Sequence, residues 1–478
     1  MTPLVIAGSA SGVGKTTIAV GLMGALRQRG LSVAPFKTGP DYIDPGYHQA
    51  VTGNPSRNLD TWLTSPDIVS EIFRRGSAGA DVAVIEGAMG LFDGRTGCGN
   101  VCSTAETARL TGGSVALVVD CSRLARSLAP LLAGFAAFDH KVNLAGAILN
   151  NVGSAGHARA LEGAAREAGV PVLGVLPRRE DIHLRSRHLG LVQAEESVRR
   201  RGSVQAKETV HAGESVHSGE LDELLGRIIS HVAENVDLDR LRALAAIEKS
   251  EKESSRHAGK AKGRGRVRIA VARDEAFSFY YVDSLEALEA AGAELVYFSP
   301  VHDTELPDCE GMYLGGGYPE LFASELEANS PMRRSIAHAV DRELPVYAEC
   351  GGLVYLCRAV TVDGVARGMA GALPLEAKMT GRRQALGYVE ASARKDNLLL
   401  EAGETVRGHE FHWSAVEWRQ RNVAYDCHSS REAASKPDGF SAGNLLASYV
   451  HIHFAGNPEA AARFVRTCAV EGVASRAV

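Results

Sequence analysis

Residues 8–17 read GSASGVGKTT and combine glycines, a lysine and two threonines in a pattern that binds nucleotide phosphates. Glycines let backbone N–H groups converge on phosphate oxygens, and the N-terminus of a following helix adds partial positive charge. The apolar run 4–10 precedes this segment and the helical pattern 18–30 follows it, as in a P-loop. Five residues separate Gly8 from Gly14, one more than in the GxxxxGK(S/T) pattern. The alternative is a glycine turn before a Rossmann-type helix.

Each residue type in this loop has its own expected contact with the nucleotide. The Lys15 ammonium would meet the β- and γ-phosphates, and the Thr16 hydroxyl would meet a Mg²⁺ ion. The residues expected to hold the phosphates are Gly12, Val13, Gly14, Lys15, Thr16 and Thr17.

Carboxylates that could hold Mg²⁺ follow two further apolar runs. DVAVIEG is a buried-strand pattern that ends near Glu86, and LSVAPFKTGPDYIDPG is a strand followed by a loop with Lys37, Asp41 and Asp44. Mg²⁺ prefers hard oxygen ligands, and carboxylates beside a triphosphate are of that kind. We therefore expect Thr16 and Glu86, together with Asp41 or Asp44, to bind the ion. Turn formation is the alternative for both aspartates, because each lies beside a proline.

A second chemistry is indicated by the segment AECGGL around Cys350. This cysteine lies between an apolar strand pattern and a helical pattern, and two glycines follow it. A nucleophile on such a sharp turn is exposed, and the N-terminus of the next helix favours the thiolate. A cysteine nucleophile needs a base, and SYVHIHF supplies His451 and His453 at strand spacing, so both would point to one face. For the cysteine alone, a buried structural thiol is the alternative.

A glycine-rich segment upstream completes this second arrangement. MYLGGGYPE reads as a strand that runs into three glycines. Backbone N–H groups in such a loop can donate hydrogen bonds to an oxyanion. We expect Gly316, Gly317 and Gly351 to be these donors. A nucleophile, two histidines and a set of donors together favour catalysis over a structural thiol.

Length and composition limit the possible functions. The 478 residues can build two or three domains, and a net charge of −5 argues against nucleic acid as the main partner. No apolar run is long enough to span a membrane and no signal-peptide pattern is present, so we expect a cytoplasmic protein without a membrane partner. Eight scattered cysteines fit a reducing compartment. Cys98 and Cys102 lack a second ligand pair nearby, which argues against a metal site.

Hydrophobic patterning predicts that an α/β fold positions these residues. Strands and helices alternate in the first part of the chain, which is typical of a mostly parallel sheet with helices on both faces. Ligands of such a sheet bind at the carboxyl ends of the strands, where the motifs fall. The first expected strands are 3–8, 32–37, 82–86, 115–120, 143–149 and 171–176, with helices at 16–29, 104–110 and 157–168. A second α/β unit begins at 267, with strands expected at 294–298, 311–314, 345–348, 386–392 and 446–452.

Hydrophobic patterning and composition also predict where the domains end. We expect a first domain at 1–245, of which 193–245 is largely helical, and a second domain at 267–478. Residues 246–266 are rich in Lys, Arg, Ser and Gly, which is typical of an exposed linker. The basic end of this linker could touch nucleic acid, but a solvated tether is the favoured interpretation.

The motifs taken together closely resemble the cobyrinic acid a,c-diamide synthase family, through nearly the whole chain. The resemblance implies that 1–245 is an ATP-dependent amide-ligase domain of the dethiobiotin-synthetase-like P-loop branch. It implies that 267–478 is a class I glutamine amidotransferase-like domain. The chain departs from the family in its long basic linker and in its two cysteines at 98 and 102. The motifs that carry the resemblance are GSASGVGKTT, FKTGPDYIDP, VIEGAMGLFDG, RHLGL (187–191), AFSFYY (276–281), LGGGYPEL, ECGGL, GHEFHWS (408–414) and SYVHIHF.

The resemblance also implies a reaction. Cys350 would attack the side-chain amide of glutamine while His451, in the base position, manages the proton. His453 would orient the base, at the place where ordinary class I glutaminases carry Pro-Glu. ATP would phosphorylate a substrate carboxylate, and the released ammonia would displace phosphate from the acyl phosphate. The substrate would be a tetrapyrrole carboxylate, namely the a and c acetates of cobyrinic acid, with hydrogenobyrinic acid and nickel sirohydrochlorin as open alternatives.

Further residues take roles from the same resemblance. Lys37 would neutralise charge on the transferring phosphoryl group. Asn150 would recognise adenine, although capping of a strand end is the alternative. A homodimer is expected from the way related folds place their active sites. The residues expected to position the substrate carboxylates are Asp41, Tyr42, Asp44 and Asp93.

Two other classes of function compete with this interpretation. Partitioning-type ATPase switches carry a GKTT loop, but they have an additional lysine five residues before the P-loop lysine, where this chain has Ala10. They also lack a cysteine glutaminase half. A stand-alone hydrolase with a vestigial ATPase half is disfavoured by the intact Lys15, Thr16 and Glu86.

Overall fold

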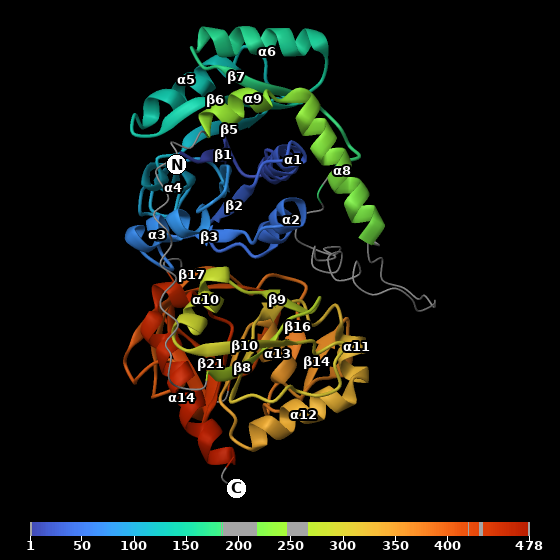
Figure 1. The fold of residues 1–478 in the computed structure, drawn as a ribbon, viewed down its shortest axis with the longest axis vertical. Helices are drawn as coiled ribbons and strands as arrows, with labels where there is room; N and C mark the ends of the chain where they lie inside the picture. The colour runs from blue at the N-terminus through green and yellow to red at the C-terminus, as the bar shows by residue number, and fades with distance from the viewer. Residues whose placement is uncertain are drawn as a thin grey trace. The chain divides into compact units, whose positions relative to one another are not determined.

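The computed structural model describes residues 2–182, 184, 218–245, 266–418, 420–429 and 434–476. The chain divides into two compact units, one of residues 1–61 and 65–253 and one of residues 62–64 and 254–478 (Figure 1). The RHLGL motif, with His188, lies outside the described residues, and so does the predicted linker apart from Arg266. Within the described part of the chain, no helix is both long and apolar enough to cross a membrane.

The first unit contains a seven-stranded parallel sheet in the order β3-β2-β4-β1-β5-β6-β7. Because β1, β2 and β4 lie side by side, the three segments that follow them meet at one edge of the sheet. The strands are β1 (Leu4–Gly8), β2 (Val33–Thr38), β3 (Arg57–Leu59), β4 (Val82–Glu86), β5 (Ser114–Asp120), β6 (Asn143–Val152) and β7 (Val172–Pro177). The helices are α1 (Lys15–Gln28), α2 (Ile43–Thr52), α3 (Pro66–Gly76), α4 (Thr104–Thr111), α5 (Leu128–Phe138), α6 (Ala155–Glu167), α8 (Ser218–Asn235) and α9 (Leu238–Leu244).

Local sequence explains where several of these helices begin. Ser65, Ser103 and Ser154 precede α3, α4 and α6, and each serine oxygen accepts a hydrogen bond from the N–H group three residues further on. Serine at this position satisfies a donor that the first helical turn cannot pair internally. These helices therefore start where the sequence supplies a cap.

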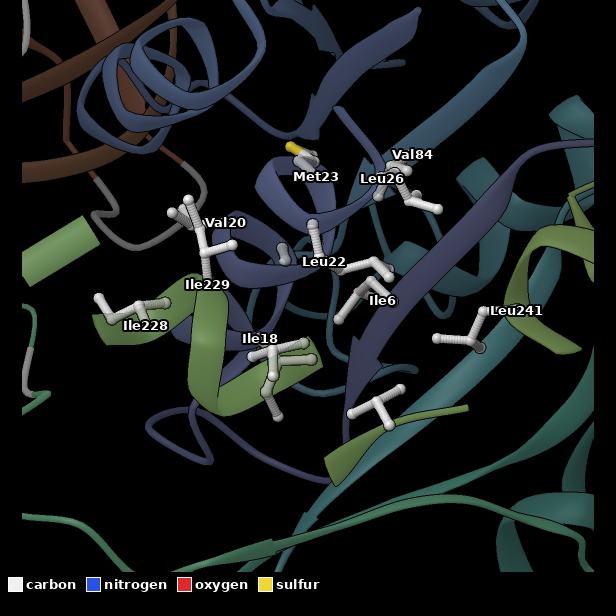
Figure 2. Close-up of a cluster of buried hydrophobic side chains, with 14 of the residues drawn as sticks. Ile6, Ile18, Val20, Leu22, Met23, Leu26, Val84, Ile228, Ile229 and Leu241 are labelled. Atoms are coloured by element: carbon white, nitrogen blue, oxygen red, sulfur yellow. The ribbon is translucent and has the colours of Figure 1, made fainter. Parts of the chain in front are cut away.

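The P-loop helix α1 is held in place by α8, whose sequence lies some 200 residues away along the chain. A Cβ atom on Gly21 would lie 2.4 Å from Cγ2 of Val232, and one on Gly24 would lie 2.5 Å from Cδ1 of Ile229. The two glycines thus let the helices approach closely. Figure 2 labels Val20 of α1 and Ile229 of α8 in the same cluster of buried side chains. The helix that presents the P-loop therefore rests on a close-packed core.

The second unit is built on a ten-stranded sheet in the order β10-β8-β11-β13-β22-β21-β20-β17-β18-β23. Its first five strands are parallel and the rest pair antiparallel. The sheet strands are β8 (Val267–Ala272), β10 (Ala293–Phe298), β11 (Gly311–Leu314), β13 (Val346–Glu349), β17 (Ala385–Ala393), β18 (Thr405–His412), β20 (Val423–Ser429), β21 (Lys436–Ala442), β22 (Leu445–Ser448) and β23 (His451–Ile452).

Smaller elements surround this sheet. β9 (Phe277–Phe279) pairs with β12 (Gly316–Gly317), and β15 (Val365–Gly368), β14 (Ala359–Val362), β16 (Glu376–Met379) and β19 (Ser414–Val416) form a four-stranded sheet in that order. The helices are α10 (Val282–Ala290), α11 (Ala323–Ala328), α12 (Ser330–Asp341), α13 (Gly351–Leu356) and α14 (Pro458–Arg476), with 3-10 turns η2 (Gln420–Asn422) and η3 (Phe454–Gly456). The predicted fold class, two α/β units of which the first has a parallel sheet, is confirmed.

One predicted strand is wrong in a way that matters for the site. The segment expected as a single strand at 446–452 is divided into β22, next to β13, and β23, which pairs with β18 at the other end of the sheet order. Only Tyr449 and Val450 connect the two strands, so the Cα atoms of Ser448 and His451 can lie at most about 11 Å apart. The antiparallel part of the sheet must therefore curl back towards β22. His453 follows β23 and starts the turn η3, so the expected strand alternation does not reach it.

Candidate active site

The P-loop of the first unit has the backbone that a phosphate cradle requires. Gly12 and Gly14 adopt left-handed conformations, with φ of 78° and 95°. Only glycine takes such values readily. Asn150, at the end of β6, donates a 2.9 Å hydrogen bond from Nδ2 to the Val13 carbonyl, and a Cβ atom on Gly14 would lie 2.4 Å from the same nitrogen. Asn150 thus braces the loop; a contact with adenine stays a prediction.

The P-loop lysine is buried and turned onto its own loop. Lys15 Nζ donates to the Ala10 carbonyl at 3.2 Å. Burial, and next the neighbouring Lys37, lower the pKa of Lys15 to about 8, although Glu86 and Asp44 act in the opposite direction. A lysine in this position gains much from an anionic partner, which is what a nucleotide phosphate would supply.

Lys37 and Glu86 meet on neighbouring strands, where the parallel register of β2 and β4 pairs their Cα positions. Lys37 Nζ lies 2.9 Å from Glu86 Oε1 and 2.5 Å from Asp44 Oδ2, and Thr16 Oγ1 donates to Glu86 Oε1 at 2.7 Å. Burial would lower the pKa of Lys37, but Asp44 and Glu86 raise it well above its ordinary value. Burial would likewise raise the pKa of Glu86, but Lys37 and next His48 hold it far below the usual range. Both groups therefore carry their charges.

This cluster suits a divalent cation. Burial raises the pKa of Asp44 to about 8, with further contributions from Asp41 and Glu86, because one lysine does not offset all the negative charge of the group. Thr16 Oγ1 lies 3.5 Å from Asp44 Oδ2 and 2.7 Å from Glu86 Oε1, which brings three hard oxygen donors together. The oxygens of Thr16, Asp44 and Glu86 thus fit Mg²⁺.

The two predicted aspartates of this loop differ in what they contact. Asp41 Oδ1 accepts hydrogen bonds from the amides of Ile43 and Asp44 at 2.8 and 3.2 Å, so Asp41 shapes the start of α2. Asp44 instead reaches Lys37 and Thr16. Of the two alternatives for the metal, the geometry favours Asp44.

Asp93 and Tyr42, the remaining residues predicted to contact the substrate, lie on loops at the carboxyl ends of the strands of the first sheet. Asp93 is exposed and its Oδ2 accepts from the Gly90 amide at 2.9 Å. Tyr42 directly precedes α2. Contacts with a substrate carboxylate stay a prediction for both residues.

His48 is a site residue that the sequence reasoning missed. Its Nε2 lies 2.7 Å from Glu86 Oε2 and its Nδ1 lies 3.0 Å from Ser56 Oγ. His48 follows Asp44 by four residues on α2, which is the spacing of neighbours on one helical face. The four-residue spacing between Asp44 and His48 was the sequence signal that could have identified His48 as a site residue.

In the second unit, three segments meet at the carboxyl ends of β11, β13 and β22, which are neighbours in the sheet. Cys350 follows β13 with φ of 46° and ψ of −96°, a strained conformation for a residue with a side chain. Its amide donates to the Ser448 carbonyl at 2.8 Å. A Cβ atom on Gly352 would lie 2.2 Å from the Leu314 carbonyl oxygen, so the residues after the turn must be small. This is the strand-to-helix turn expected for the nucleophile.

His451 faces Cys350. The thiol and the imidazole share a hydrogen bond, and Nδ1 of His451 lies 3.5 Å from Glu349 Oε2. Burial would lower the pKa of His451, but the hydrogen bonds and charges of Cys350 and Glu349 raise it to about 10. His451 is therefore held in its positively charged imidazolium form, directly beside the thiol of Cys350.

Glu349 is the second residue that sequence reasoning missed. Its carboxylate accepts hydrogen bonds from the hydroxyls of Tyr313 and Tyr347 at 2.9 and 2.5 Å and from the Ile452 amide at 2.9 Å. A buried carboxylate held by three donors is fixed in one orientation. Its signal in the sequence was its place directly before Cys350.

The orienting role expected for His453 is not what the structure gives. His453 is fully buried, neither ring nitrogen has a hydrogen-bond partner in the described part of the chain, and the ring stacks on Tyr281 with centroids 4.6 Å apart. Burial lowers the pKa of His453 to about 3, so the ring is neutral. Glu349 occupies the position next to His451 that we had expected His453 to take.

The three glycines expected to stabilise an oxyanion lie together at this turn. A Cβ atom on Gly316 would lie 2.6 Å from Cε1 of His451, and one on Gly351 would lie 2.9 Å from the Gly317 nitrogen. The glycine strand therefore passes directly over the nucleophile turn and the base. This places Gly316, Gly317 and Gly351 beside Cys350; which amides would donate to an oxyanion stays a prediction.

Comparison with known families follows the same division of the chain. Residues 4–192 match the CobQ/CobB/MinD/ParA nucleotide binding domain. Residues 268–459 match the CobB/CobQ-like glutamine amidotransferase domain. The chain thus contains a nucleotide-binding domain and a glutamine amidotransferase domain.

Curated proteins extend the likeness over the whole chain. A cobyrinate a,c-diamide synthase of Dehalococcoides mccartyi is 42% identical over 471 residues, which cover 97% of each chain. A hydrogenobyrinate a,c-diamide synthase of Streptomyces coelicolor is 43% identical over 498 aligned positions, again 97% of each chain. The identity and the coverage show that the chain belongs to the family of the cobyrinate a,c-diamide synthases.

Proposed function

We propose that this protein uses ATP and glutamine to amidate the a and c acetate carboxylates of cobyrinic acid. The observation that carries the proposal is one chain holding a Cys350–His451–Glu349 arrangement and a P-loop site with Lys37, Asp44 and Glu86. The names of the full-length relatives support the substrate class. Hydrogenobyrinic acid, named for one relative, and nickel sirohydrochlorin are the alternative substrates.

Ammonia would be produced in the second unit. The Cys350 thiolate attacks the side-chain carbonyl carbon of glutamine, and the amides at Gly316, Gly317 and Gly351 stabilise the oxyanion. The His451 imidazolium gives its proton to the departing nitrogen, so ammonia leaves and a thioester forms. Water then attacks the thioester with His451 as base, and glutamate is released. Glu349 keeps the imidazole oriented and favours its charged form throughout.

Carboxylate activation would take place in the first unit. A carboxylate oxygen of the substrate attacks the γ-phosphorus of ATP, and ADP leaves. Lys15 and Lys37 would stabilise negative charge on the phosphoryl group. Ammonia then attacks the acyl carbon and phosphate leaves, which is possible because phosphate is a far better leaving group than oxide.

The proposed cofactor is Mg²⁺, held by Thr16, Asp44 and Glu86. A bound Mg²⁺ would supply positive charge next to the β- and γ-phosphates. Asp41, Tyr42 and Asp93 are proposed to position the substrate carboxylates from the neighbouring loops.

The domain boundaries and the cellular context are part of the proposal. We place the amide-ligase domain at 1–245, the linker at 246–266 and the amidotransferase domain at 267–478. A cytoplasmic location is supported by the eight cysteines, which are free thiols. A homodimer stays a prediction that light scattering of the purified protein can check.

The test is turnover with each of the three macrocycles in the presence of ATP and glutamine. Mass spectrometry should detect two amides on the preferred macrocycle, with one ATP hydrolysed for each amide. ATP hydrolysis without amide formation on any tetrapyrrole would reject the proposal and would favour a partitioning-type ATPase switch.

A further inference from the structure

We propose that His48 is a positioning residue that locks the Glu86 carboxylate and ties helix α2 to it. The nucleotide and metal ligands would then be held in register with the substrate-facing loop that precedes α2. The inference rests on the proposed function for the identity of the reaction. Its main measurement, however, is cation binding, which does not depend on the substrate.

The two oxygens of Glu86 have separate partners. Oε1 accepts from Thr16 Oγ1 at 2.7 Å and from Lys37 Nζ at 2.9 Å, on the side that faces the P-loop. Oε2 lies 2.7 Å from His48 Nε2. Glu86 and His48 are both completely buried. A carboxylate bonded through both oxygens cannot rotate freely, so His48 determines where Oε1 points.

The imidazole is itself held by a third element. His48 Nδ1 lies 3.0 Å from Oγ of Ser56, a buried residue directly before β3. A carboxylate accepts hydrogen bonds only, so Nε2 must donate to Glu86. Ser56 then meets the remaining nitrogen as donor or acceptor and fixes the plane of the ring. The ring therefore joins the end of β4 to α2 and to the start of β3.

Helix α2 contacts the site at two points on one face. Asp44 and His48 are four residues apart, so their side chains lie on the same side of the helix. Asp44 contacts Lys37, which in turn contacts Glu86, while His48 contacts Glu86 directly. The position of α2 is thus set at both points by the residues around Glu86.

The loop before α2 depends on that position. Asp41 accepts hydrogen bonds from the first amides of the helix, and Tyr42 follows it. A shift of α2 would therefore move the residues proposed to face the substrate carboxylate. In this arrangement His48 acts through Glu86 and through α2, and it has no step of its own in the reaction.

The experiment uses the full-length protein with the substitutions His48→Leu, His48→Asn, His48→Gln and Ser56→Ala. The exposed His140 provides the matched control His140→Leu. Mn²⁺ affinity is measured by electron paramagnetic resonance with a non-hydrolysable ATP analogue, and thermal unfolding checks the fold. Ammonium-dependent amidation gives kcat and the KM for the macrocycle.

We expect His48→Leu to weaken Mn²⁺ binding about 10- to 100-fold, as for other partners of metal-binding residues. The same substitution should raise the KM for the macrocycle and lower kcat. Glutamine can place an amide N–H near the former Nε2, so His48→Gln should recover part of the affinity, whereas the shorter His48→Asn should not. Ser56→Ala should give a smaller loss, and His140→Leu should give none.

A folded His48→Leu protein with Mn²⁺ affinity and KM within about twofold of the wild type would overturn the inference. If His48→Leu does not fold, equal Mn²⁺ affinities for wild type, His48→Asn and Ser56→Ala would overturn it as well. Lack of amidation by the wild type would reject the proposed function instead, and the Mn²⁺ titration would still decide the role of His48.

Discussion

Oε2 of Glu349 lies 3.5 Å from Nδ1 of His451, so the residue directly before the nucleophile faces the base of the same site. The relationship joins the end of β13 to β23, two strands far apart in the sheet order. It exists because two residues connect β22 to β23 and bring His451 back over the turn. The carboxylate next to His451 therefore comes from β13, the strand that ends directly before Cys350, and not from the residues that follow the histidine.

Removing the charge of Glu349 should impair glutamine hydrolysis. Glu349→Gln keeps the size of the side chain but withdraws the negative charge that raises the pKa of His451, so less imidazolium is present at neutral pH. We expect the kcat for glutamate release to fall about 100-fold, within the range typical of acid–base groups. Ammonium-dependent amidation is the internal control and should stay near the wild-type rate. Unchanged glutamate release would show that Glu349 does not act on His451.

The raised pKa of His451 predicts a pH dependence of stability. The folded-state value of about 10 lies above the ordinary 6.5, so the stabilising contribution is full below about pH 6.5 and is lost as the pH rises towards 10. The unfolding free energies of wild type and His451→Asn, measured by urea titration, should therefore differ most near pH 6. A difference that grows from pH 6.5 to 10 would contradict the assignment of charge.

Substitution of His453 should have little effect on the chemistry. His453→Phe preserves the ring that stacks on Tyr281 and removes two buried nitrogens that make no hydrogen bond in the described structure. We expect glutamate release within about threefold of the wild type, since neither ring nitrogen of His453 makes a hydrogen bond among the described residues through which it could orient His451. If His453 did orient His451, the loss would be about 100-fold, as for other acid–base groups.

Lys37 should matter for stability as well as for catalysis. Lys37→Met leaves Asp44 and Glu86 buried together without the cation that joins them. Loss of one partner of a buried ion pair costs about 3–5 kcal/mol of unfolding free energy. Denaturant unfolding should detect this loss, and amidation should fail with glutamine and with ammonium alike. As a control, Arg74→Met breaks an exposed pair with Glu71 and should change stability by less than about 1 kcal/mol.

Features that a short stretch of sequence encodes could be predicted, whereas features that depend on contacts between distant segments could not. Short runs of apolar residues and glycines encode three features: the P-loop, the strand ends at Lys37 and Glu86, and the turn at Cys350. Within the first unit, parallel strand order then brings the P-loop next to Lys37 and Glu86, as expected. The division of the 446–452 segment is not local, because it depends on pairing with β18 some 40 residues away. For that reason the strand alternation that we expect for His451 and His453 does not reach His453, which precedes the turn η3.

The residues that were missed are single polar side chains without a motif of their own. His48 and Glu349 are each buried next to a partner from a distant segment, and burial of one polar residue is not visible in the sequence. Two weak signals existed. His48 lies four residues after Asp44, and Tyr347 lies two residues before Glu349, on the same face of β13.

The central claim is that carboxylate activation and ammonia release occur in separate halves of the chain. The most direct test compares amidation by Cys350→Ser with glutamine and with ammonium as the nitrogen source, with Lys15→Ala measured in parallel. We predict that Cys350→Ser loses activity with glutamine and keeps it with ammonium, while Lys15→Ala loses both. A folded Cys350→Ser protein that is inactive with ammonium would contradict the account.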